Sequence, residues 1–191
     1  MTKVIIVHGW SGDPTDCWIP WLKNELKQKG FEVITPIMPD TDYPIIEKWV
    51  SKLSEVVQGP NVNTFLVGGS IGCQTILRYL ETIDTPIGGA VFVAGWFNLE
   101  NLESPEEVEI AKPWIETSID FKKVKSVLPK ATLIISDNDP FGCFEENKTK
   151  FAQIVTKEIV IHNAGHFETG DGFAKLPEIV SELQNMIKAT I

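Results

Sequence analysis

Hydrophobic residues occur in this chain as short continuous runs, not in alternation with polar residues. Six runs rich in β-branched residues recur at positions 4–7, 31–34, 65–67, 90–94, 133–135 and 159–161. Continuous apolar runs of this length are typical of strands that are buried on both faces of a parallel sheet. The pattern therefore predicts a mainly parallel sheet of six strands.

Apolar residues at helical spacing fall between these runs. Helices are predicted from Trp18 to Gly30, from Asp42 to Gly59, at 74–80, from Asp120 to Leu128 and from Leu176 to Ile187. Asp42 and Pro44 are typical of a helix cap and a first-turn proline. Alternating strands and helices favour an α/β fold, a three-layer sandwich with right-handed crossovers. We expect the strand order 2-1-3-4-5-6, which creates a topological switch point between strands 1 and 3.

The interval from Gly95 to Lys130 is too long for one ordinary crossover. It contains the acidic stretch from Glu100 to Glu109 and three aromatic residues, Trp96, Phe97 and Trp114. An insertion at the carboxyl edge of a strand is a natural lid over a crevice, so a lid is predicted at about 95–119. The three aromatic residues either line a substrate pocket there or pack the helix onto the sheet.

Length and composition predict one domain over residues 1–191. The chain is 43% hydrophobic and has a net charge of -9, which disfavours nucleic acid and anionic membranes as obligate partners. The first apolar run is too short for a signal peptide core, so a soluble cytoplasmic protein is expected. Three cysteines lack a C-x-x-C pair, which argues against a disulfide framework or a zinc knuckle.

The segment Gly68-Gly69-Ser70-Ile71-Gly72 carries the most specific chemical signal. A G-x-S-x-G sequence between a strand and a helix is typical of a nucleophile elbow, in which glycines allow the two elements to approach closely. The strained turn lifts the serine hydroxyl above the sheet, at the positive end of the following helix. Ser70 is therefore the candidate nucleophile.

A serine nucleophile needs a base, and the base needs an acid that fixes its tautomer. The loop with His166 follows the last predicted strand and can reach Ser70, whereas His162 stands at the strand end and is expected to pack or bond locally. The acid is expected after the preceding strand. Asp139 is favoured over Asp137 because Pro140 stiffens its turn.

Two backbone N–H groups are expected to stabilise the oxyanion that forms during acyl transfer. One is that of Ile71, directly after the nucleophile. The second comes from the loop after the first strand, where Trp10 is preferred and Gly9 is the alternative. His8 is then expected to position this loop and not to act as the base.

No metal and no cofactor are predicted. Phe141 and Lys148 stand where an EF-hand that begins at Asp137 would need oxygen ligands. His162 and His166 are four residues apart, but Gly165 between them makes a helical zinc motif improbable.

These residues together resemble the α/β-hydrolase superfamily over nearly the whole chain. The His8-Gly9 loop and the segments Met38-Pro39-Asp40, Asp139-Pro140-Phe141 and Gly165-His166-Phe167 are similar to those of small serine hydrolases related to retinoblastoma-binding protein nine. The resemblance implies a Ser70, Asp139 and His166 triad and a small lid. Related elbows often carry histidine where this chain has Gly69, a change that bears on packing more than on activity.

The expected function is hydrolysis of small acyl esters, with amides as the second choice, through an acyl-enzyme on Ser70. The alternative hypothesis is a protein-binding or regulatory protein that retains the hydrolase fold, since relatives of both kinds are described and fold does not fix function. A small acyl substrate is the expected partner. The sequence does not specifically indicate a protein partner.

Overall fold

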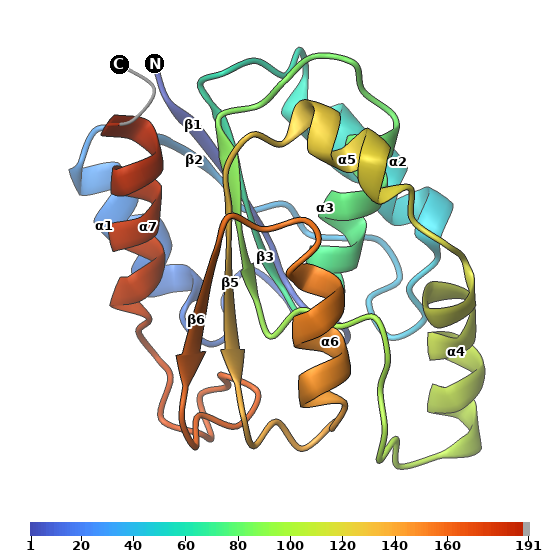
Figure 1. Ribbon diagram of the computed structural model, residues 1–191. Coiled ribbons are helices and arrows are strands. Elements are labelled where there is room, and N and C mark those ends of the chain that lie inside the picture. Colours follow the sequence, from blue (N-terminus) through green and yellow to red (C-terminus); the bar gives the residue numbers. More distant parts are fainter. Residues whose placement is uncertain (189–191) are drawn as a thin grey trace.

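Six parallel strands form one sheet in the computed structural model, which describes residues 1–188 (Figure 1). The strands are β1 (Lys3–Val7), β2 (Glu32–Ile34), β3 (Thr64–Gly69), β4 (Gly89–Val93), β5 (Ala131–Ser136) and β6 (Lys157–Ile161). Their order is β2-β1-β3-β4-β5-β6. The predicted strands and sheet order are therefore confirmed. The last three residues of the predicted domain, 189–191, lie outside the described part of the chain.

Helices cover both faces of the sheet. Helices α1 (Ile19–Gln28) and α7 (Pro177–Lys188) cover one face, and α2 (Ile46–Val57), α3 (Ile71–Glu81), α5 (Phe121–Val127) and α6 (Phe144–Phe151) cover the other (Figure 1). Helix α4 (Pro105–Glu116) lies beside this second layer, at the lower right of Figure 1. The strands point toward the lower edge of that view, where the loops after them gather. The three-layer α/β sandwich is confirmed.

Strand β1 shows why the apolar runs are continuous. Val4 and Ile6 pack with the residues of α1 and α7, while Ile5 and Val7 pack on the opposite face with those of α2 and α3. Successive side chains of a strand point to opposite faces, so a strand with helices on both sides needs apolar residues at every position.

The predicted start of α2 is wrong. The helix begins at Ile46 after an extended Ile45, and no side chain caps it. The preceding residues contact other parts of the molecule instead. The Asp42 carbonyl accepts a hydrogen bond from Trp10 Nε1 at 3.0 Å, and the Pro44 carbonyl accepts one from Trp114 Nε1, also at 3.0 Å. Tertiary contacts thus keep this segment outside the helix.

The interval predicted as an insertion contains α4. The helix begins with a capping box, in which the Ser104 side chain accepts from the Glu107 N–H and the Glu107 carboxylate accepts from the Ser104 N–H. Pro105 occupies the first turn, where a missing N–H costs nothing. Neither α4 nor α6 was predicted from the sequence. Helix α6 lacks a clear apolar face, because only Asn147 and Phe151 are buried and its exposed residues are mostly charged.

Within the described residues, no helix is both long enough and apolar enough to cross a bilayer.

Candidate active site

Ser70 occupies a strained turn between β3 and α3. Its φ is 52° and its ψ is -123°, a backbone conformation that residues other than glycine rarely adopt. The Ser70 N–H donates to the Val93 carbonyl at 2.9 Å, which ties the turn to β4. A Cβ at Gly68 would lie 2.8 Å from Cys73 N, and one at Gly72 would lie 2.5 Å from the Val7 carbonyl oxygen. Glycine is therefore required at both positions, as a nucleophile elbow demands.

Asp139 and His166 form a hydrogen-bonded pair. His166 Nδ1 lies 2.6 Å from Asp139 Oδ2, and the two side chains are only 10% and 12% exposed. The other carboxylate oxygen of Asp139 accepts from the Phe141 N–H at 3.0 Å. The Phe141 ring packs edge-on against the imidazole, with 4.9 Å between the ring centroids. These contacts fix the imidazole so that its Nε2 is the atom left for chemistry.

Two side chains tie the loop after β5 to the loop after β6. Ser136 Oγ accepts from the Ala164 N–H at 3.0 Å, and Asn138 Oδ1 accepts from the Gly165 N–H at 2.8 Å. Ser136 Oγ also donates to Asn138 Oδ1 at 2.7 Å. The loops that carry Asp139 and His166 are therefore held together independently of the carboxylate–imidazole bond.

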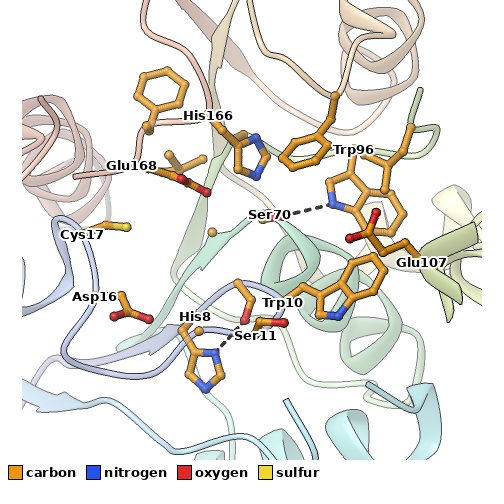
Figure 2. Close-up of a pocket in the computed structure, with 18 of the residues that line it drawn as sticks. His8, Trp10, Ser11, Asp16, Cys17, Ser70, Trp96, Glu107, His166 and Glu168 are labelled. Carbon is orange, nitrogen blue, oxygen red and sulfur yellow. Dashed lines mark hydrogen bonds between the residues drawn. The ribbon is translucent and has the colours of Figure 1, made fainter. Parts of the chain in front are cut away.

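Ser70 and His166 line the same cavity, which has a volume of about 680 Å³. Figure 2 shows the imidazole of His166 above Ser70. Among residues 1–188 there is no hydrogen bond between Ser70 Oγ and His166. Ser70 Oγ instead accepts a hydrogen bond from the indole Nε1 of Trp96 at 3.2 Å. Bonds between nucleophile and base are often long in unliganded enzymes and shorten when substrate binds.

The two expected oxyanion donors come from the elbow and from the loop after β1. Helix α3 begins at Ile71, so the Ile71 N–H belongs to the first turn, which has no carbonyl partner within its own helix. On the β1 loop, the Gly9 carbonyl is held by the His8 side chain at 2.8 Å and by the Gly12 N–H at 3.3 Å. The Trp10 N–H of the same planar peptide points the opposite way.

His8 is buried and its tautomer is fixed. Its Nε2 accepts from the Met38 N–H at 3.1 Å, so Nδ1 carries the proton and donates to the Gly9 carbonyl. Burial lowers the pKa of His8 below its usual value, which keeps the ring neutral. The position of His8 agrees with the expected role in holding the loop.

Of the three aromatic residues proposed for the pocket, only Trp96 lines the cavity. Phe97 and Trp114 lie in the hydrophobic core, where Phe97 contacts the rings of Phe121 and Phe151. The pocket prediction is therefore wrong for Phe97 and Trp114. Helix α4 and the loop before it do line the cavity, through Leu99, Leu102, Ser104, Glu106, Glu107 and Ile110.

His162 bonds locally, as expected. Its Nδ1 lies 2.5 Å from Asp137 Oδ2, and the Asn163 N–H donates to the second oxygen of the same carboxylate. These hydrogen bonds lower the pKa of Asp137, that from His162 most. The His162 side chain is 77% exposed, so this histidine–aspartate pair is accessible to solvent, unlike the pair of Asp139 and His166.

The cavity wall is acidic. Among residues 1–188, no lysine or arginine lines it, whereas five acidic residues do: Asp16, Asp42, Glu106, Glu107 and Glu168. In the described part of the chain, no three His, Cys, Asp or Glu side chains are grouped so as to hold a metal ion.

The sequence over residues 4–185 matches the Serine hydrolase family. The chain belongs to this family. The chain is also similar to the YdeN hydrolase of Bacillus subtilis (strain 168). The two are 31% identical over 186 residues, which cover 96% of this chain and 95% of YdeN. Membership makes this protein a hydrolase of the serine hydrolase family within the α/β-hydrolase superfamily.

Solved structures agree with the serine hydrolase fold. The crystal structure of the Bacillus subtilis ydeN gene product has a TM-score of 0.90 at 28% identity, covering 98% of this chain and 100% of that one. A YdeN-like hydrolase from Pectobacterium atrosepticum has a TM-score of 0.69 at 16% identity, with coverages of 100% and 93%. Est1E from Butyrivibrio proteoclasticus, with bound ferulic acid, has a TM-score of 0.71 at 12% identity, with coverages of 96% and 90%. The last two show the fold alone.

Two residues that contribute to the site, and one contact of a third, were not identified from the sequence. Ser136 and Asn138 flank the chosen acid in a short polar run and look like ordinary turn residues there. Trp96 was placed in the pocket, but nothing in the sequence indicates its hydrogen bond to Ser70.

Proposed function

We propose that this serine hydrolase cleaves small acyl esters, and amides less readily, through an acyl-enzyme on Ser70. One observation carries the proposal. The strained Ser70 of the elbow shares a cavity with the imidazole of His166, and Nδ1 of that imidazole lies 2.6 Å from the Asp139 carboxylate. This combination of a nucleophile, a base and an orienting acid is what acyl transfer requires.

In the acylation step, Ser70 Oγ attacks the ester carbonyl carbon while its proton passes to His166 Nε2. The Asp139 carboxylate holds the proton on Nδ1 and stabilises the imidazolium that forms. Collapse of the tetrahedral intermediate breaks the bond to the alcohol, which departs with the proton from His166. The Ile71 and Trp10 N–H groups are the proposed donors to the oxyanion, each worth about 3 to 4 kcal/mol in such sites.

In the deacylation step, water gives its proton to His166 Nε2 and its oxygen bonds to the acyl carbon. The bond from that carbon to Ser70 Oγ then breaks, and Ser70 recovers its proton from His166. The carboxylic acid leaves, and the enzyme returns to its resting state without any cofactor.

A panel of p-nitrophenyl esters from acetyl to palmitoyl tests this proposal. The apolar wall of Leu99, Leu102 and Ile110 is bordered by carboxylates. Each buried methylene contributes about 0.8 kcal/mol only while it contacts apolar surface. We therefore expect kcat/KM to be highest for the acetyl to butyryl esters and to fall for longer chains. A maximum at palmitoyl would contradict a small-acyl specificity.

The acidic wall leads to a second expectation, on substrate charge. The five acidic residues, with no lysine or arginine beside them in the described lining, repel anions from the cavity. The p-nitrophenyl monoester of succinic acid should therefore have a kcat/KM about tenfold below that of the butyrate ester, a neutral acyl group of similar length. The gap should narrow as salt is added, because salt screens exposed charges. Equal values at low salt would show that these carboxylates do not influence substrate entry.

A further inference from the structure

The indole of Trp96 makes the one polar side-chain contact to the candidate nucleophile among residues 1–188. Its Nε1 lies 3.2 Å from Ser70 Oγ, and the bond is dashed in Figure 2. An indole N–H can only donate, so the serine oxygen is the acceptor and its own proton stays available to His166. Trp96 is almost completely buried, with 3% of the residue exposed.

A sharp, tightly packed turn precedes Trp96 and positions its indole. Ala94, directly after β4, has a φ of 47°, a left-handed conformation that turns the chain sharply at the end of the strand. A Cβ on the next residue, Gly95, would lie 2.5 Å from the Phe151 ring, so the turn packs without space for a side chain. A strained, tightly packed turn of this kind persists only where the surrounding structure holds it.

Buried amide side chains hold Trp96 and the two residues that follow it. Gln74 Nε2 donates to the Trp96 carbonyl at 3.0 Å, and Gln74 stands one helical turn after Ser70 on α3. Asn147 of α6 accepts from the Phe97 and Asn98 N–H groups at 2.8 and 2.9 Å. Gln74 and Asn147 are 1% and 3% exposed. The nucleophile and its indole donor are thereby fixed to the same helix.

We propose that Trp96 is a catalytic residue that stabilises negative charge on Ser70 Oγ, and that its main effect is on deacylation. This inference rests on the proposed acyl-enzyme function. The serine oxygen has four positions: one bonds Cβ, one carries the proton for His166, one attacks the carbonyl carbon and one remains. The Trp96 N–H occupies the position that attack does not need, so it can stay in place throughout the reaction.

The two chemical steps differ in how much this donor helps. Before acylation, the hydroxyl oxygen of Ser70 already accepts the hydrogen bond well, so little is gained on reaching the transition state. In the acyl-enzyme the same oxygen is an ester oxygen and a poor acceptor. As its bond to the acyl carbon breaks, it becomes an alkoxide and then takes the proton from His166. A hydrogen bond to a charged oxygen is about twice as strong as a neutral one, so the donor promotes this departure.

The test is Trp96→Phe, which keeps an aromatic ring and removes the N–H. With p-nitrophenyl acetate as substrate, kcat should fall about fivefold to tenfold, while kcat/KM, which reports acylation, should change less than twofold. Rapid acid quenching and intact-protein mass spectrometry should show a larger steady-state fraction of acetylated Ser70 in the variant. A purely structural role would lower both rate constants together and leave this fraction unchanged.

Trp114→Phe is the matched control. Its indole is also buried and donates one hydrogen bond, to the Pro44 carbonyl, but it does not line the cavity. This variant should keep the wild-type acylated fraction. Gln74→Met provides a second route to the same answer if Trp96→Phe does not fold. Gln74 is a positioning residue, and its loss should raise the acylated fraction less than the loss of the indole does.

Two results would overturn the proposal for Trp96. An unchanged acylated fraction in a folded Trp96→Phe protein would show that the N–H does not act on the leaving oxygen. Faster acylation in that variant would show that the indole restrains the resting serine. A wild-type protein that neither turns over the ester nor acetylates Ser70 would refute the proposed function itself, and with it this role of Trp96.

Discussion

Ser70→Ala is expected to abolish both turnover of p-nitrophenyl acetate and labelling by a fluorophosphonate probe. Removal of the nucleophile in serine hydrolases of this mechanism lowers kcat by about 10⁶-fold. Alanine lacks only the hydroxyl oxygen of serine, and both residues carry a Cβ that disfavours the φ of 52° to the same extent. The substitution therefore adds no new strain, and the backbone of the elbow should be unchanged. Labelling is measured by mass spectrometry, with one probe molecule expected on each wild-type chain.

Ser11→Ala is the matched control for this experiment. Ser11 lines the same cavity and has the same φ of 52°, but it does not lie in the elbow. This variant should label and turn over as the wild type does. Stoichiometric labelling that persists in Ser70→Ala would refute the assignment of the nucleophile.

Asp139→Asn is expected to lower kcat by about 10³- to 10⁴-fold while leaving the protein folded. The amide has nearly the same shape as the carboxylate, but it offers an N–H where His166 Nδ1–H needs an acceptor. The imidazole then favours the tautomer with its proton on Nε2, the atom that must accept the Ser70 proton. Steady-state kinetics with p-nitrophenyl acetate measure the loss.

The chain supplies its own control for this change. Asp137 and His162 form a pair with the same atoms at 2.5 Å, but the pair stands in solvent and does not line the cavity. Asp137→Asn should therefore change kcat by less than about twofold. A large loss from Asp137→Asn with a small loss from Asp139→Asn would reverse the assignment of the acid.

The sheet was predictable because its strands are buried on both faces. Positions 4 to 7 of β1 each meet a helix layer, and the resulting continuous run of apolar residues is hard to mistake. The elbow was predictable for a similar reason. The close contacts at Gly68 and Gly72 require glycine, and this requirement leaves a visible sequence pattern.

The parts that were not predicted depend on contacts between distant residues. Asp42 and Pro44 have the chemistry of a helix start, yet the indoles of Trp10 and Trp114 bind their carbonyls and keep them apart from α2. Phe97 and Trp114 have the chemistry of pocket residues but lie in the core. Helix α4 did leave a local signal, the capping box of Ser104 and Glu107, which the acidic character of the surrounding stretch obscured.

The hydrogen bonds of Ser136 and Asn138 have a consequence for how this site can move. They join the loops after β5 and β6, so Asp139 and His166 are held in position relative to each other. Ser70 is held through other bonds, because it accepts from the Trp96 indole and Gln74 of α3 holds the Trp96 carbonyl. Among residues 1–188, the contact between Ser70 Oγ and His166 is thus the one step of the proposed triad that no hydrogen bond sets. A substrate that bridges Ser70 and His166 needs to close this one contact, not assemble three separate groups.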